Sequence, residues 1–145
     1  MRLSVITMLL AIVCAINGSA HADDAAPVSA ADQQAIRQVV TSQLDAFRRD
    51  AGDDAYRYAS PNIQKMFGSA AQFMAMVRQA YPAVYRPRSF EFDRLVTIDG
   101  LIVQRVMLVG PDGAPALALY TMEREPDGTW RIDGCILTRP DKFDT

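Results

Sequence analysis

The chain has 145 residues, half of them hydrophobic, and its 15 basic and 17 acidic side chains leave a formal net charge of −2. A chain of this length suits one domain that can bury a core of its own. The basic side chains are scattered along the sequence and form no cluster, which argues against a nucleic acid as the main partner.

The first 22 residues have the pattern of a secretory signal peptide. Arg2 is followed by a nearly continuous apolar run over residues 3–16, and Ala20-His21-Ala22 has the small-x-small pattern of a cleavage site. The run is shorter than the roughly 20 residues that span a bilayer. We therefore expect cleavage after Ala22, export to the periplasm or the medium, a mobile leader over residues 23–29, and no membrane attachment of the mature protein.

Cleavage would also remove most of the side chains that metal and redox sites need. The single histidine, His21, and one of the two cysteines, Cys14, lie in the signal segment, so the mature chain keeps Cys135 alone. Without imidazole or a second thiol, a histidine-based triad, a metal site and an internal disulfide are not expected. The sequence thus predicts no cofactor and no metal.

Three serines divide the first half of the mature chain into helices. Ser29, Ser60 and Ser69 each precede a run with apolar residues at helical spacing. A hydroxyl acceptor immediately before such a run is typical of a helix start. The helix that contains Phe73 should stop at Pro82, and an irregular piece over residues 83–87 should lead into the second half.

Three Asp-Gly pairs, beginning at Asp99, Asp112 and Asp127, divide the second half. Asp-Gly favours hairpin turns because both positions tolerate a positive φ. The runs between the pairs predict a four-stranded antiparallel meander: Ser89–Ile98, Leu101–Val109, Ala114–Arg124 and Thr129–Thr138. The predicted fold class is α+β, with N-terminal helices packed on this curved sheet in a single domain over residues 30–140, followed by a tail over 141–145.

If the turns set the register without bulges, Arg94 lies opposite Arg105, and Tyr120 lies in the same row as Asp133. Both faces of such a sheet are too apolar to sit in water. We assign the face of Trp130 to the helices and expect the other face to pack against a second copy of the chain, giving a homodimer. A β-bulge near Arg94 would move part of the first strand to the opposite face.

Helices followed by a curved sheet that ends in Asp127-Gly128-Thr129-Trp130-Arg131-Ile132 resemble the nuclear transport factor 2-like (SnoaL-like) superfamily. Several pieces also resemble the domain-of-unknown-function 4864 (DUF4864) family: Ala59-Ser60-Pro61-x-Ile63-Gln64, Phe67-Gly68-Ser69, Tyr85-Arg86-Pro87-Arg88-Ser89, Gly110-Pro111-Asp112-Gly113 and Trp130-Arg131-Ile132-x-Gly134-Cys135. The superfamily resemblance implies a cone in which helices close over a sheet and leave a pocket, with an outer face that often dimerises. The DUF4864 resemblance implies no activity, so no catalytic residue is carried over.

The segment Tyr85-Arg86-Pro87-Arg88, between the last helix and the first strand, is a candidate binding site. Its two guanidinium groups could grip a carboxylate or a phosphate with forked donors. The alternative, which we favour, is structural: Arg86 and Arg88 pair with nearby acids such as Glu91 or Asp50 and fasten the segment to the helices.

The sheet offers a second candidate site. Arg105 would be repelled by Arg94 unless an acid lies near, and Asp133 with Tyr120 is the available neutraliser. A ligand carboxylate there is one hypothesis, and a structural network inside a dimer interface is the favoured one. Gln104, on the side expected to face the helices, could orient a small ligand at a pocket mouth.

Three functions remain open on the sequence alone. The leading hypothesis is a non-catalytic exported domain that binds a small amphipathic ligand or a protein partner in its cone. The second is a cofactor-free isomerase, dehydratase or hydrolase that uses a carboxylate and a tyrosine. The third is a dimeric accessory protein whose own side chains fill the cone. Whether the interior is empty and polar, empty and apolar, or filled distinguishes them.

Overall fold

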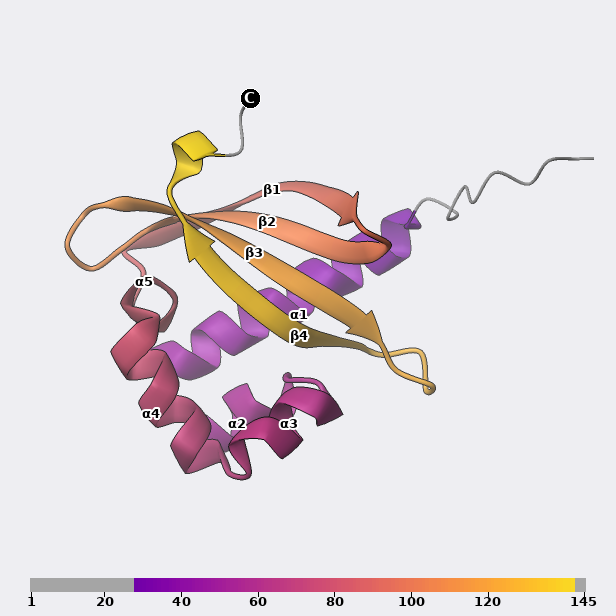
Figure 1. The fold of residues 1–145 in the computed structure, drawn as a ribbon, viewed down its shortest axis with the longest axis horizontal. Coiled ribbons are helices and arrows are strands. Elements are labelled where there is room, and N and C mark those ends of the chain that lie inside the picture. The colour runs from indigo at the N-terminus through magenta and orange to yellow at the C-terminus, as the bar shows by residue number, and fades with distance from the viewer. Residues whose placement is uncertain (1–27, 143–145) are drawn as a thin grey trace, which may run out of the picture.

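The computed structural model describes residues 28–142. Five α-helices precede a four-stranded sheet, and a short 3-10 turn, Pro140–Lys142, ends the described chain (Figure 1). The predicted α+β fold class is confirmed. The predicted signal peptide, most of the leader, and residues 143–145 lie outside the described residues. Within residues 28–142 no helix is long and apolar enough to cross a bilayer.

The helices begin where the serine caps place them. The side chains of Ser29, Ser60 and Ser69 accept hydrogen bonds from backbone N–H groups in the first turns of the helices that follow. The helices are α1 Ala30–Arg48, α2 Gly52–Arg57, α3 Pro61–Phe67, α4 Ala70–Ala80 and α5 Pro82–Tyr85. The segment after Pro82, predicted to be irregular, forms the one-turn helix α5, because proline at the first helical position suits a helix start.

The sheet is a meander in which each strand pairs antiparallel with the next. Its strands are β1 Ser89–Ile98, β2 Leu101–Val109, β3 Pro115–Arg124 and β4 Trp130–Thr138. In the first hairpin, Asp99 and Gly100 both have positive φ, as the Asp-Gly pattern predicts. The strand boundaries therefore agree with the sequence to within one residue.

The predicted register is wrong beyond the first hairpin. Tyr120 pairs with Gln104 and with Cys135, so it lies on the helix side of the sheet and not beside Asp133. The cause is the Pro-Asp-Gly sequence of the second and third loops, because proline has no N–H and cannot complete the hydrogen-bonded pair that closes a two-residue Asp-Gly turn. Both become three-residue loops, which are closed by hydrogen bonds from the Gly110 amide to the Ala114 carbonyl oxygen and from the Glu125 amide to the Thr129 carbonyl oxygen. Each loop instead places its glycine, Gly113 or Gly128, in the left-handed region and shifts the next strand.

Two β-bulges shift the register further. In β1, Asp93 and Arg94 together oppose Arg105, which is the bulge anticipated near Arg94. In β4, Asp133 is an extra residue between the pairs Thr121–Gly134 and Met122–Ile132. This second bulge was not predicted. It turns Ile136 to the outer face, where the side chain is 63% exposed, whereas the unbulged register placed it under the helices with Trp130.

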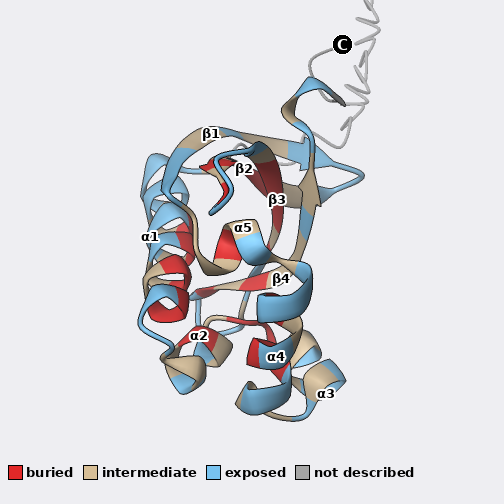
Figure 2. Cartoon of the chain, turned by 90° about the vertical axis from the view of Figure 1, so that its left-hand side faces the viewer, coloured by how far each residue is buried: buried red, intermediate tan, exposed pale blue. Residues whose placement is uncertain are grey.

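The main core lies between the helices and one face of the sheet. Ile36, Val40 and Phe47 of α1 meet Trp130 and Ile132 of β4, which confirms that the Trp130 face is the helix-facing one. Figure 2 shows the buried residues of α1 on the side turned to the sheet. A second, smaller cluster lies on the outer face, where Val103, Leu117 and Leu119 are buried and are flanked by partly buried residues: Val96 and Met107.

Candidate functional site

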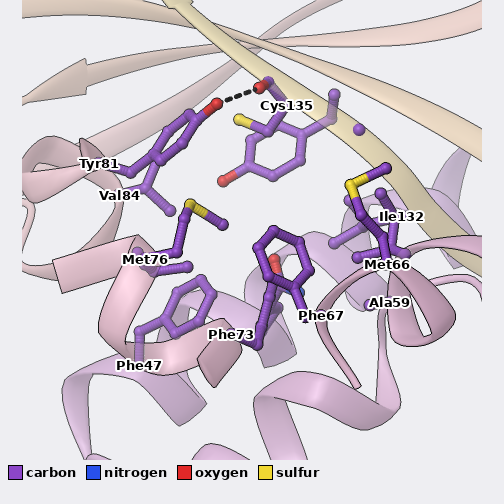
Figure 3. A pocket seen from close by; sticks show the side chains of 15 residues that line it. Phe47, Ala59, Met66, Phe67, Phe73, Met76, Tyr81, Val84, Ile132 and Cys135 are labelled. Carbon is purple, nitrogen blue, oxygen red and sulfur yellow. Dashed lines mark hydrogen bonds between the residues drawn. The ribbon is translucent and has the colours of Figure 1, made fainter. Parts of the chain in front are cut away.

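A pocket of about 240 Å³ lies between α3, α4 and the helix-facing side of β3 and β4 (Figure 3). We call the space that the helices and the sheet enclose here the cone. Its lining residues come from the helices, the loops beside them and the two strands: Gln43, Phe47, Ala59, Ile63, Met66, Phe67, Phe73, Met76, Val77, Tyr81, Val84, Tyr120, Ile132, Gly134 and Cys135. Met66 lines the pocket and is also 69% exposed, so the pocket reaches solvent beside α3.

Two short helices supply the apolar wall by the same spacing. In α3 the lining residues are Ile63, Met66 and Phe67, and in α4 they are Phe73, Met76 and Val77; each set follows the i, i+3, i+4 pattern of one helix face. Phe73 anchors this wall, since its ring centroid lies 5.6–5.9 Å from those of three other aromatic rings: Phe47, Tyr56 and Phe67.

Only a few polar groups face this wall. The Tyr81 hydroxyl donates a hydrogen bond of 3.0 Å to the Cys135 carbonyl oxygen (Figure 3). The side-chain amide nitrogen of Gln43 donates a hydrogen bond of 3.1 Å to the Ala55 carbonyl oxygen. The Tyr120 hydroxyl is buried and meets no nitrogen or oxygen acceptor among the described residues. It interacts with the Cys135 side chain, and a thiol is only a weak hydrogen-bonding group, so the Tyr120 proton has no strong acceptor there.

The interior keeps its titratable groups neutral. Burial raises the pKa of the Cys135 thiol to about 12, and burial also raises the pKa of Tyr120 well above its ordinary value. The fifteen described residues that line the pocket include no acidic or basic side chain. Within residues 28–142, no group of three or more His, Cys, Asp or Glu side chains is placed to hold a metal ion. The pocket is thus open, apolar and uncharged.

The family model described as Domain of unknown function (DUF4864) matches residues 29–145. The chain belongs to this family. A solved structure described as an NTF-2 like protein of unknown function, from Burkholderia xenovorans LB400, is similar with 18% sequence identity and a TM-score of 0.45. The similarity covers 74% of this chain and 86% of that one. No match was found among curated proteins.

In this DUF4864 domain, the segment from Tyr85 to Arg88 contacts the end of α1 as the structural alternative predicts. Asp50, which follows α1, accepts a hydrogen bond from the Tyr85 hydroxyl. Its carboxylate also forms an ion pair with the Arg86 guanidinium, at 2.8 Å. The Arg86 guanidinium also lies 4.1 Å from the centroid of the Tyr85 ring and donates to the Phe47 carbonyl oxygen. Arg88 donates instead to the Pro111 carbonyl oxygen, at 3.1 Å, and so contacts the second hairpin.

In the DUF4864 domain, the candidate site residues of the sheet other than Tyr120 make contacts at the two β-bulges. Arg105 forms an ion pair with Asp93 at 2.8 Å, and the buried Gln104 amide donates to the carbonyl oxygens of Asp93 and Arg105. Asp133 accepts a 2.6 Å hydrogen bond from Ser60. The expected grouping of Arg105, Tyr120 and Asp133 is therefore wrong, because the loops and bulges separate them.

Of the seven candidate residues, Tyr120 alone lines the pocket of the DUF4864 domain. Sequence reasoning missed Tyr81 and the apolar residues of α3 and α4 that line the pocket. Their helical spacing was visible, but spacing cannot tell a filled core from a lined pocket. An additional signal was the brevity of α3, a helix of 7 residues.

Proposed function

We propose that this domain is a non-catalytic binding protein that takes an uncharged, mostly apolar small molecule into the pocket of its cone. The observation that supports it is an open interior with an apolar lining and no charged side chain. Ligand pockets in proteins are typically apolar with a few placed polar groups. A cone filled by its own side chains, as an accessory protein would have, fits this open interior less well.

The volume limits the size of the ligand. A cavity of about 150 Å³ accommodates benzene, so a pocket of about 240 Å³ suits a body of roughly ten non-hydrogen atoms. A longer ligand would extend past the exposed Met66 into solvent. The expected ligand is therefore small, or has a small apolar part that enters the pocket.

The electrostatics limit its charge. A buried ion without a partner is strongly unfavourable, and the described lining offers no opposite charge. The Cys135 thiol does not supply an anion, because its pKa of about 12 keeps it protonated at physiological pH. A neutral ligand is the one that this interior stabilises.

The same lining disfavours the alternative of a carboxylate-and-tyrosine enzyme. Such a mechanism needs a general base in reach of the substrate. The pocket supplies Tyr120, but Asp133 does not line it and binds Ser60 instead. Nucleophilic catalysis by Cys135 is disfavoured as well, because the reactive form of cysteine is the thiolate.

We also propose that the domain acts outside the cytoplasm. This rests on the sequence pattern of Arg2, the apolar run over residues 3–16, and Ala20-His21-Ala22. Intact-mass analysis of the exported protein should give an N-terminus at Asp23. A protein retained in the cytoplasm with its N-terminus uncleaved would contradict export.

A calorimetric titration with a matched pair of probes tests the binding function. Tetralin has the expected size and no charge, and 1,2,3,4-tetrahydro-2-naphthoate carries the same rings with a carboxylate. We expect tetralin to bind at least about tenfold more tightly than the carboxylate, since the pocket cannot pair the charge.

Two tryptophan variants on one helix locate the binding. Ile63→Trp places a large ring in the pocket and should abolish tetralin binding. Lys65→Trp changes an exposed residue of the same helix that does not line the pocket, and should leave binding unchanged. No binding of tetralin to the native protein, or equal binding to both variants, would contradict the proposal.

A further inference from the structure

The central residue of the pocket is Tyr120, in the middle of β3. Its backbone pairs with Gln104 on one side and Cys135 on the other, and its side chain has no exposed surface. The ring belongs to the main core, while the residue also lines the pocket. Core packing around the ring therefore fixes the position of the hydroxyl, and a ligand must adapt to it.

That hydroxyl has only a weak partner in its surroundings. It is buried and meets no nitrogen or oxygen acceptor among residues 28–142, whereas buried polar groups in proteins are nearly always fully paired. The Tyr81 hydroxyl donates to the Cys135 carbonyl oxygen, and no hydrogen bond joins it to Tyr120. The Tyr120 hydroxyl interacts instead with the Cys135 side chain, and a thiol is only a weak hydrogen-bonding group.

The protonation state makes Tyr120 a donor. Burial raises its pKa well above the ordinary value, so the phenol keeps its proton across the physiological range. A ligand oxygen that accepts this proton would replace the weak interaction with the Cys135 side chain by a full hydrogen bond. A ligand without an acceptor would leave the hydroxyl with its weak partner.

We propose that Tyr120 selects the ligand, and that the pocket takes molecules with one carbonyl oxygen, of the ketone or ester type, on an otherwise apolar body. A carboxylate would need a cation, which the described lining does not offer. A carbonyl oxygen needs one donor, which Tyr120 supplies. This inference rests on the proposed binding function.

The test compares 1-tetralone with tetralin, which has the same ring system without the carbonyl. Tyr120→Phe removes only the hydroxyl. We expect this variant to lower the affinity for 1-tetralone relative to tetralin by about tenfold, the effect of one neutral hydrogen bond. Tyr56→Phe is the matched control, because the Tyr56 hydroxyl donates to the Gln64 carbonyl oxygen and does not line the pocket. It should leave the ratio unchanged.

A second measurement covers a failure of Tyr120→Phe to fold. The infrared carbonyl stretch of 1-tetralone bound to the native protein should lie at lower frequency than in a hydrocarbon solvent, because a hydrogen bond weakens the C=O bond. A hydrocarbon-like frequency, or a ratio that Tyr120→Phe does not change, would overturn the role of Tyr120 and leave the binding function standing. If neither probe binds the native protein, the proposed function fails together with this inference.

Discussion

At the scale of single residues, Tyr120 and Cys135 show how the pocket stays uncharged. They are paired neighbours on β3 and β4, and both line the pocket. Burial is the largest cause of the raised pKa of each. The result is a polar pair that remains neutral and can take part in hydrogen bonding without acting as an acid or a base.

We predict that Cys135 reacts slowly with alkylating reagents in the folded protein. A pKa of about 12, against an ordinary value of 9.0, leaves far less thiolate at pH 8. Labelling by iodoacetamide, followed by peptide mass mapping of Cys135, should be on the order of a thousandfold slower in native protein than in guanidinium, in line with the difference in thiolate fraction. Comparable rates in the two states would show that the thiol is not held in a dry pocket.

Acid should weaken the contact between α1 and the sheet. The indole Nε1 of Trp130 donates to Asp32 at 3.1 Å, and this bond, with those from Ser29 and Arg124, lowers the pKa of Asp32 below 3.8. A carboxylate with a lowered pKa contributes stability above pH 3.8 and loses it as the pH falls through the folded pKa.

Asp32→Asn should therefore flatten the loss of thermal stability below about pH 4. Trp130 is the one tryptophan of the chain, so its fluorescence reports the contact directly. In the native protein its emission should change over the same acidic range. An acid dependence identical in the native protein and the variant would contradict this role of Asp32.

At the scale of elements, α3 is attached to the sheet through Ser60, the residue that caps its N-terminus. The Ser60 amide donates to the Ile132 carbonyl oxygen at 2.8 Å, and the Ile132 amide donates to the Tyr58 carbonyl oxygen at 2.9 Å. The Ser60 hydroxyl both caps α3 and donates to Asp133 at 2.6 Å. The bulge in β4 thus holds the N-terminus of the helix that forms one wall of the pocket.

Replacing this serine should be more costly than replacing a comparable cap. Ser60→Ala removes a buried hydroxyl with two hydrogen bonds, and we expect a loss of about 2 kcal/mol in the free energy of unfolding. Ser69→Ala removes the exposed cap of α4, with one such bond, and should cost about 1 kcal/mol or less. Urea unfolding of both variants gives the comparison, and equal losses would contradict the attachment.

Sequence patterns predict the helices and strands of this domain better than they predict the pairing register of the strands. The serine caps and the Asp99-Gly100 turn are local signals, and each predicted its element correctly. The bulge at Asp133 has no local signal, because its partner, Ser60, is 73 residues away in the chain. The pocket depends on that bulge and on three-residue loops, so sequence patterns placed Tyr120 on the wrong face.

At the scale of the whole molecule, the outer face of the sheet still suggests a second copy of the chain. Ile136 is 63% exposed there, beside the cluster of Val103, Leu117 and Leu119. We expect the native protein to sediment as a dimer at tens of micromolar. Ile136→Asp should give folded monomers, while Ala75→Asp, at an exposed position of α4, should not. A native protein that sediments as a monomer would contradict this interface.

The central claim is that a neutral apolar molecule enters the cone, and methionine methyl NMR tests it most directly. Met66 and Met76 line the pocket, whereas Met107 lies on the outer face and Met74 packs near Gly52. On addition of tetralin, the methyl signals of Met66 and Met76 should shift and show nuclear Overhauser contacts to the ligand, while those of Met74 and Met107 stay in place. Contacts to Met107 alone, or no shifts at saturating tetralin, would contradict the claim.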